Sequence, residues 1–308
     1  MVDTAPPGAT RAGRDRATPL AGPVEILDRT GDRVVAATGV PPDEPVLAGH
    51  FPNFPIFPGV CLLECAHQTV LGAAAGPAGP GEVPDLSVIE RARFRQPVFP
   101  GDQVRAEAAV TPDRSGVRAR VEVSAGPPGA EPVQAATFRL AYQARPVRPP
   151  GVDIKALLPH RFPMLLVDRV TEVVPQQSLQ AIKAVTLNEP CYAAIADDAD
   201  QAYPPALMVE SWCQAAGILA CLEHPDPAAF QGRVTLFASI TDLELPGRAY
   251  PGDVLRHTVR LVRLVSDAAI LEGGSTIEGR TVQTVGGITI ALRPAGVLSR
   301  AGGTGAQP

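Results

Sequence analysis

Residues 49–70 are GHFPNFPIFPGVCLLECAHQTV, and this stretch decides how the surrounding chain folds. Prolines at positions 52, 55 and 58 exclude a helix over that segment and hold its backbone extended or turned. A helix is therefore predicted to begin at Gly59 and to continue to about Ala75. Nearly all of its residues are apolar, which predicts a helix buried on most sides.

Three polar side chains interrupt this apolar helix. Glu64, His67 and Gln68 are three and four positions apart, which places them on one stripe. A carboxylate on so apolar a helix is costly unless it is hydrogen-bonded or neutral, and Gln68 lies one turn from Glu64. Taken singly, Glu64 is most simply a satisfied core carboxylate and His50 a loop histidine. Their occurrence together favours a functional site.

The residues form the pattern GHFPxxPIxPGVxxxExxxQ, which fixes roughly ten positions over about twenty. It resembles the motif of hotdog-fold 3-hydroxyacyl-[acyl-carrier-protein] dehydratases, which convert a 3-hydroxyacyl thioester into a trans-2-enoyl thioester. In that family the histidine is the base and the acidic residue fourteen positions later is the acid. The glycine at the helix start donates its N–H to the thioester carbonyl. The resemblance gives these positions to His50, Glu64 and Gly59.

The same resemblance implies further contacts around the histidine. Phe51, Pro58 and Val60 are expected to touch the substrate, and the carbonyl of Ile56 is expected to orient His50.

Length and composition limit the class of protein. With 308 residues the chain can form two domains, each with its own core, and its net charge of −5 argues against a nucleic-acid binder that relies on bulk charge. The five cysteines include no metal-type CxxC pair, and most lie in predicted apolar helices, where they behave as small hydrophobes. No run approaches the ~18 apolar residues that span a bilayer. A cytoplasmic protein without membrane contact is expected.

The order of elements predicts the fold class. Residues 1–20 have no periodicity and are expected to be a disordered arm, and residues 23–40 are expected to form two strands around a turn at 29–32. After the helix, four further strands are predicted at residues 86–94, 103–111, 117–124 and 133–142. One helix with an antiparallel sheet wrapped around it is an α+β layout, which matches the hotdog fold.

The second half of the chain repeats the first. A Pro-rich hinge at residues 144–151 precedes DIKALLPHRFPMLLVDRVTEV at 153–173, which resembles the opening segment of the same dehydratases and has no counterpart in the first half. Residues 203–219 match the long helix, and residues 250–253 repeat residues 99–102, so the period is about 146 residues. We therefore predict hotdog domains at 21–145 and 152–296, packed as a pseudo-dimer, and a flexible tail at 297–308.

The two copies differ in chemistry. Glu210 and Gln214 occupy the positions of Glu64 and Gln68, but counting back from Glu210 gives Ala196 where the first copy has His50. Pro205 stands where the first copy has Gly59, and a proline has no N–H to donate.

In the single-domain relatives, the histidine of one subunit faces the acidic residue of the other. Carried over to this chain, His50 and Gly59 would meet Glu210, with Gln214 contacting the substrate. The opposite site, with Glu64, would be inactive.

The expected chemistry needs these residue types. A neutral imidazole is a suitable base for the weakly acidic proton next to a thioester carbonyl, so His50 would take that proton. The N–H of Gly59, at a helix N-terminus, would meet the developing enolate charge. Glu210, in its neutral form, would protonate the departing hydroxyl. No metal or organic cofactor is implied, and no cluster has metal-ligand spacing.

The other candidates receive structural interpretations. His67 and His160 are expected to be structural. His224 and His257 are expected to lie at the surface. Trp212 and Met208 are expected in the core rather than lining an acyl tunnel.

An acyl carrier protein is the expected partner, and it is acidic. Arg91, Arg93 and Arg95 alternate along a predicted strand and therefore face one side. They fit a docking surface for the carrier and equally a solvated strand face. A homodimer of the fused chain also remains open.

Two other classes of function stay open beside the dehydratase. One is a hotdog thioesterase, which would need a carboxylate to position water. The other is a non-catalytic subunit that binds acyl chains, suggested by the losses in the second copy. The intact set of His50, Gly59 and Glu210 favours the dehydratase.

Overall fold

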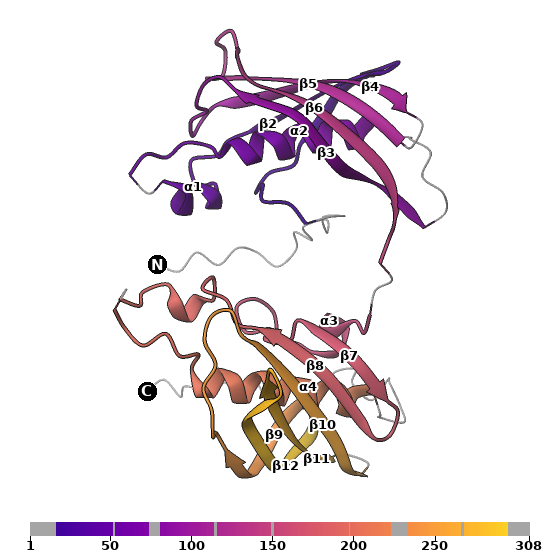
Figure 1. Cartoon of the computed structure of the whole chain (residues 1–308), viewed down its shortest axis with the longest axis vertical. Coiled ribbons are helices and arrows are strands. Elements are labelled where there is room, and N and C mark those ends of the chain that lie inside the picture. Colours follow the sequence, from indigo (N-terminus) through magenta and orange to yellow (C-terminus); the bar gives the residue numbers. More distant parts are fainter. Residues whose placement is uncertain are drawn as a thin grey trace, which may run out of the picture. The chain divides into compact units, whose positions relative to one another are not determined.

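The chain divides into two compact units, residues 1–148 and 149–308, and each is described by itself (Figure 1). The computed structural model describes residues 17–51, 53–73, 81–113, 116–148, 151–196, 198–222, 233–265 and 268–294. The predicted tail and residues 1–16 of the predicted arm lie outside these ranges. Residues 17–20 of that arm belong to the first unit, because the side chain of Leu20 is only 3% exposed and lies in its core.

The first unit is a six-stranded antiparallel sheet around one long helix. Its elements are β1 (Glu25–Thr30), β2 (Arg33–Gly39), α1 (Pro45–His50), α2 (Gly59–Ala73), β3 (Glu82–Phe94), β4 (Gln103–Asp113), β5 (Gly116–Gly126) and β6 (Val133–Pro146). The strand order is β1-β2-β4-β5-β6-β3. The predicted strand and helix segments are confirmed, and α2 begins at the predicted Gly59.

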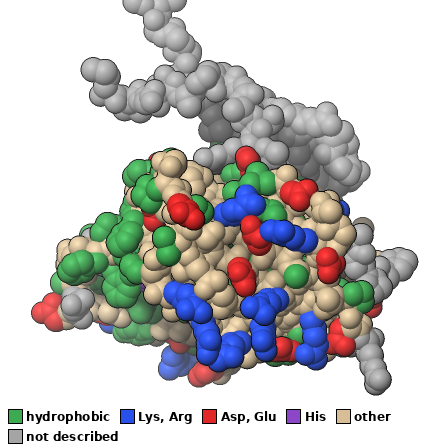
Figure 2. Space-filling view, turned by 90° about the horizontal axis from the view of Figure 1, so that it is seen from above, with side chains coloured by type: hydrophobic (Ala, Val, Ile, Leu, Met, Phe, Trp, Pro, Cys, Tyr) green, Lys and Arg blue, Asp and Glu red, His purple; other side chains and the backbone are tan. Residues whose placement is uncertain are grey.

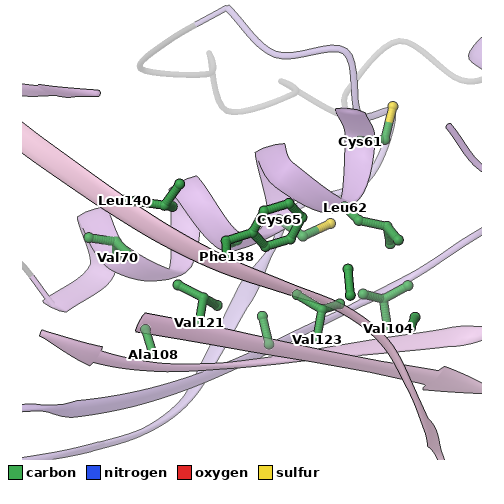
Figure 3. Close-up of a cluster of buried hydrophobic side chains, with 14 of the residues drawn as sticks. Cys61, Leu62, Cys65, Val70, Val104, Ala108, Val121, Val123, Phe138 and Leu140 are labelled. Atoms are coloured by element: carbon green, nitrogen blue, oxygen red, sulfur yellow. The ribbon is translucent and has the colours of Figure 1, made fainter. Parts of the chain in front are cut away.

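Strand alternation places the core of the first unit between α2 and the sheet (Figure 3). Along β5, every second residue from Val117 to Ala125 is buried, while the residues between them face outward. Cys65 and Val70 of α2 pack into the same cluster. The helix is therefore fixed against the sheet, which also fixes the residue at its N-terminus.

The second unit repeats this topology. Its elements are α3 (Ile154–Leu157), β7 (Arg169–Val174), β8 (Ser178–Ala184), the 3-10 turn η1 (Pro190–Tyr192), α4 (Pro205–Leu222), β9 (Arg233–Glu244), β10 (Val254–Val265), β11 (Ala268–Ile277) and β12 (Arg280–Pro294). The strand order β7-β8-β10-β11-β12-β9 corresponds one to one with the order in the first unit. The predicted tandem of α+β hotdog domains is confirmed.

The helix α4 is the core of the second unit. The expectation that no run approaches the length and apolarity of a membrane span is wrong for this 18-residue helix, but 67% of it is buried inside the unit. Trp212 is fully buried, and its indole N–H donates to the carbonyl of Thr258 at 3.1 Å. Met208 is 2% exposed, so both residues are core residues as predicted.

A matching turn gives the two units a common reference point. Gly101 and Gly252 adopt φ of 93° and 104°, which favours glycine. The carboxylates of Asp102 and Asp253 accept from the backbone N–H three residues earlier at 2.9 and 2.8 Å. Equivalent residues near these turns are therefore 151 apart, whereas Glu64 and Glu210 are 146 apart.

The sequence did not reveal the short helix that carries His50. In both units this element begins with a Glu-Pro pair, at Glu44 and at Glu189. Counted forward from that pair, the residue that corresponds to His50 is Ile195. Counted back from Glu210, the corresponding residue is Ala196. The two counts differ because the second unit has one more residue between the Glu-Pro pair and the helix glutamate. Neither position holds a histidine.

Candidate active site

His50 ends α1 and is held in one orientation. Its Nδ1 lies 3.2 Å from the carbonyl oxygen of Ile56, as the resemblance implies, and its ring centroid is 4.3 Å from that of Phe51. A carbonyl can only accept, so Nδ1 carries the proton in the neutral ring. Nε2 then keeps its lone pair and is available as a base.

His50 borders a hollow of about 480 Å³ in the first unit. Three predicted site residues, Pro58, Gly59 and Val60, line it as well, together with Pro19, Val46, Gly49, Cys61 and Phe94. Phe51 is 50% exposed but is not among the lining residues. The sequence therefore placed four of its first-unit site residues around one space.

Gly59 is the first residue of α2, where the backbone N–H has no acceptor within the helix. A Cβ at this position would lie 2.9 Å from Cε1 of Phe94, so a side chain here would require the aromatic ring to move. The backbone donor and the imidazole of His50 thus adjoin the same hollow.

The thiol that lines this hollow is not activated. Burial, with the nearby carboxylates of Glu44 and Glu64, raises the pKa of Cys61 to about 11. Burial likewise raises the pKa of Cys65 to about 12. A nucleophilic cysteine needs a lowered pKa, so both thiols are neutral at physiological pH and inert.

The equivalent hollow of the second unit is smaller and differently lined. It measures about 130 Å³, and Pro205 and Leu245 stand where the first unit has Gly59 and Phe94. An ion pair between Arg248 and Asp200, both among its lining residues, lowers the pKa of Asp200. This hollow has neither an imidazole nor a donor at the helix start.

Glu210 projects from α4 and is held by two side chains. The amide of Gln214 donates to its Oε1 at 2.8 Å, and Nε2 of His160 lies 3.3 Å from the same oxygen. The Glu210 side chain is 24% exposed, so hydrogen bonds rather than an enclosing apolar wall determine its environment. His160 is therefore next to the predicted acid.

Gln214, expected to contact the substrate, is fully buried. Besides Glu210, its amide donates to the carbonyl of Met164 at 2.7 Å and accepts from the N–H of Leu166 at 2.9 Å. All of these partners are protein atoms of the second unit. Gln214 thus ties Glu210 to the segment that follows His160.

Glu64 has a simpler setting in the first unit. Gln68 donates to it at 2.7 Å and also to the hydroxyl of Thr18 at 3.0 Å. Within the described part of the unit no histidine is bonded to Glu64. His67, interpreted as structural, is bonded instead to the hydroxyl of Tyr142 at 3.1 Å.

Comparisons with known proteins find family matches in both halves of the chain. Residues 27–126 match the ApeI dehydratase family (ApeI-like), and residues 158–285 match the FabA-like domain. The chain is 35% identical over 130 residues to the 3-hydroxyacyl-[acyl-carrier-protein] dehydratase FabZ of Campylobacter curvus, covering 42% of this chain and 87% of the relative. The chain belongs to the hotdog-fold 3-hydroxyacyl-[acyl-carrier-protein] dehydratase family.

The chain is also similar to a second FabZ relative and to one solved dehydratase structure. FabZ of Symbiobacterium thermophilum is 43% identical over 101 residues, covering 31% of this chain and 71% of the relative. An inactive mutant of the CurK dehydratase is 13% identical with a TM-score of 0.34, covering 90% of this chain and 98% of that one.

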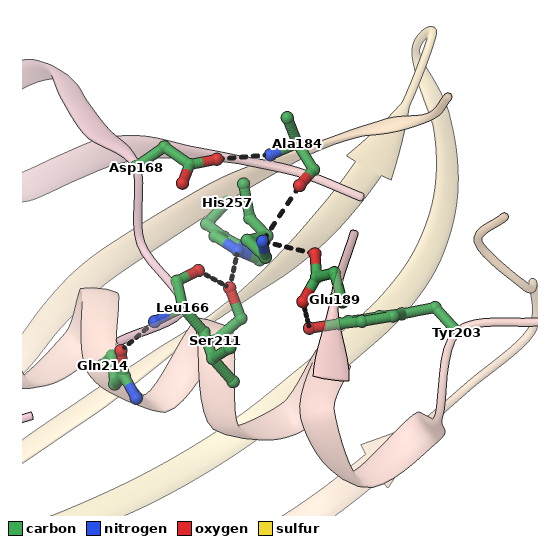
Figure 4. A network of polar contacts seen from close by, with 9 residues as sticks. Leu166, Asp168, Ala184, Glu189, Tyr203, Ser211, Gln214 and His257 are labelled. Carbon is green, nitrogen blue, oxygen red and sulfur yellow. Dashed lines mark hydrogen bonds and ion pairs between the residues drawn. The ribbon is translucent and has the colours of Figure 1, made fainter. Parts of the chain in front are cut away.

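A chain of buried polar side chains lies in the second unit and bonds to the segment that also holds Gln214 (Figure 4). The hydroxyl of Ser211 donates to the carbonyl of Leu166 at 2.7 Å and lies 2.8 Å from Nε2 of His257. On its other side, Nδ1 of His257 lies 2.8 Å from the hydroxyl of Ser275. The chain ends at the amide of Gln283, 3.4 Å from Ser275. It therefore holds the same segment as Gln214.

The prediction that His257 lies at the surface is wrong. Its side chain is 1% exposed, and burial lowers its pKa to about 3, so it remains neutral. The alternation of Leu255, His257 and Val259 on the inward face of β10 could have revealed this. His224 lies outside the described residues.

The described part of the first unit has no such polar chain. Counted from the common turn and from the helices, Cys65, Ala106, Val123 and Ala136 occupy the positions of Ser211, His257, Ser275 and Gln283. All four are buried.

A buried ion pair adds to the polar interior of the second unit (Figure 4). Lys183 lies 2.6 Å from Glu189, both side chains are at most 9% exposed, and the hydroxyl of Tyr203 donates to the same carboxylate at 3.2 Å. No motif or spacing in the sequence marks these three residues. Over the described ranges, no group of three or more potential metal ligands occurs.

Proposed function

We propose that the protein dehydrates 3-hydroxyacyl thioesters to trans-2-enoyl thioesters at one site composed of groups from both units. One observation carries the proposal. His50 and Gly59 border one hollow of the first unit, whereas Glu210 of the second unit has the more extensive hydrogen-bonded support. Neither unit contains the base, the donor and a histidine-linked acid together.

The reaction assigns one step to each group. Nε2 of His50 takes the proton from C2 of the substrate, and the electron pair moves toward the thioester carbonyl, whose oxygen accepts from the N–H of Gly59. The enolate then forms the C2–C3 double bond as the C3–O bond breaks. Glu210 protonates the departing hydroxyl, which leaves as water. The proton on His50 returns to Glu210 through solvent to complete the cycle.

Glu64 does not serve a second site in this proposal. The second unit offers Ile195 or Ala196 in place of a histidine, and Pro205 in place of a backbone donor. Its equivalent hollow is also smaller. A carboxyl without base or donor cannot carry out the elimination.

The partner and setting complete the proposal. The substrate is carried on an acyl carrier protein, as the names of the relatives say of them, and the pathway is fatty-acid or polyketide assembly. We also propose a reducing, cytoplasmic location. The free state of all five cysteines supports it.

A mass assay tests the proposed reaction. The native chain is incubated with a 3-hydroxydecanoyl chain on a purified bacterial acyl carrier protein, and the loaded carrier is followed by mass spectrometry. We expect loss of one water from the bound acyl chain. Release of the free acid would indicate a thioesterase instead, and an unchanged loaded carrier would indicate a non-catalytic subunit.

A further inference from the structure

An unusual row of arginines crosses the outer face of the first unit. Arg91, Arg139 and Arg120 lie on β3, β6 and β5, and the strand register places Arg139 directly opposite each of the other two. The neighbours of Arg139 in sequence, Phe138 and Leu140, are buried, so the arginine row faces outward. Like charges placed directly opposite one another are destabilising in a sheet.

The row is part of a larger basic surface, which we call the arginine face. A shallow hollow of about 140 Å³ there is lined by Arg91, Arg93, Arg95, Arg120, Glu122, Gln134, Thr137, Phe138 and Arg139. Its five guanidinium groups and one carboxylate give a local charge of +4 on a chain whose net charge is −5. Basic side chains gather along one border of this side of the molecule in Figure 2.

Few of these charges are neutralised within the unit. Arg120 lies 3.3 Å from Glu122, but the described part of the chain provides no ion pair for Arg91, Arg93, Arg95 or Arg139. Several other exposed arginines of this sheet are paired: Arg118, for example, pairs with both Glu90 and Asp113. The unpaired positive charge is therefore concentrated on the arginine face.

The second unit carries the opposite charge at three of the equivalent positions. Arg91 and Arg93 precede Pro100 by nine and seven residues, and Asp242 and Glu244 precede Pro251 by the same intervals. Arg120 is paired with Ala109 across the strands of the first unit. Arg260 occupies the position of Ala109 in the second unit and is paired with Glu272, so Glu272 occupies the position of Arg120. The basic surface is thus particular to one unit rather than a general property of the fold.

The arginine face adjoins the hollow of His50. Phe94, the last residue of β3, lines that hollow and lies between Arg93 and Arg95 in sequence. Alternation along the strand directs the arginines to the other side. A partner on the arginine face would therefore lie against the strand that borders the candidate active site.

We propose that the arginine face is the docking surface for the acidic acyl carrier protein, and that the carrier docks on the first unit only. This inference rests on the proposed function, because it concerns how the thioester substrate is delivered. Complementary charge speeds encounter and selects the partner, and arginine forms bidentate bonds with carboxylates. The acidic counterpart on the second unit would repel the same carrier.

The test compares two substrates for three proteins. Native protein, an Arg91→Glu/Arg139→Glu double variant and an Arg256→Glu/Arg263→Glu control are assayed with the carrier-bound 3-hydroxydecanoyl chain and with its small N-acetylcysteamine thioester. Arg256 and Arg263 are exposed on β10 of the second unit, so the control makes the same change in net charge as the double variant. Binding of fluorescently labelled carrier is measured in parallel at two salt concentrations.

We expect the double variant to raise KM for the carrier-bound substrate at least about tenfold and to leave turnover of the small thioester unchanged. Carrier binding to the native protein should weaken with salt, and binding to the double variant should respond less. Equal losses on both substrates, or an equal loss in the control, would overturn the docking proposal. Salt-sensitive carrier binding without turnover of either substrate would instead contradict the proposed reaction while leaving the docking proposal intact.

Discussion

The two units have the same strand order around the same long helix, yet they differ in their interiors. In the first, α2 begins with a glycine beside an open hollow that His50 borders, and the core behind it is apolar. In the second, α4 begins with a proline beside a smaller hollow, and a buried polar chain lies behind Glu210. In the proposed reaction, the first unit supplies the space and the base, and the second unit supplies a hydrogen-bonded carboxyl.

The largest expected effect on the dehydration rate comes from removing the proposed base, His50, which only the first unit has. His50→Gln can keep a hydrogen bond to Ile56 but has no basic atom, so we expect dehydration to fall by about 10²–10⁴-fold. The measurement is the rate of water loss from the carrier-bound chain. His67→Gln is the matched control within the same unit and should retain most of the native rate. A His50→Gln variant within a few-fold of native would remove the histidine from the mechanism.

The glycine at the start of α2 can be replaced by the proline that stands at the start of α4. Phe94→Leu combined with Gly59→Pro reproduces the pair found at Leu245 and Pro205, which avoids the clash with the Phe94 ring. Loss of one oxyanion donor should lower kcat by about 10²–10³-fold. Phe94→Leu alone serves as the control and should stay near native. Similar kcat values for the single and double variants would show that this N–H is not used.

The buried ion pair of the second unit predicts a stability difference. Lys183→Thr introduces the residue of the first unit, Thr38, and leaves Glu189 buried without its cation. Breaking such a pair costs about 3–5 kcal/mol of unfolding free energy. Urea unfolding followed by fluorescence of Trp212 reports the second unit, because it is the single tryptophan of the chain. An unchanged midpoint would mean that the pair contributes nothing net.

A smaller effect should depend on pH. His257 has a folded pKa of about 3, below the ordinary 6.5, so the unfolded state binds more protons between these values. The contribution of neutral His257 to the free energy of unfolding is complete above about pH 6.5 and decreases as the pH falls, by about 2 kcal/mol at pH 5. His257→Ala should be less stable at pH 7 but should lose this part of the acid sensitivity. Parallel pH dependences of Trp212 unfolding in both proteins would refute the assignment.

Much of the fold could be predicted from local signals. The prolines before Gly59 fixed the start of α2, and the repeat of the Pro-Gly-Asp turn and of the helix motif revealed the second unit. The short helix α1 was missed because its six residues carry no periodic pattern. The predicted arm was too long, because Leu20 is held by tertiary packing that local composition does not encode.

The site was predictable where it followed a motif and not where it depended on packing. The motif led to His50, Gly59 and the carbonyl of Ile56. The contact of His160 with Glu210 joins residues fifty positions apart, and no spacing rule connects them. The burial of Gln214 likewise arises from the segment that covers α4 rather than from the helix sequence.

The proposed division of one active site between the two units is tested most directly by two matched substitutions. Glu210→Gln and Glu64→Gln make the same change at equivalent positions of the two helices, and the rate of water loss from the carrier-bound 3-hydroxyacyl chain is measured by mass for each. We expect Glu210→Gln to lower the rate by about 10²–10⁴-fold and Glu64→Gln to leave it within a few-fold of native. A severe loss in Glu64→Gln with turnover preserved in Glu210→Gln would contradict the account.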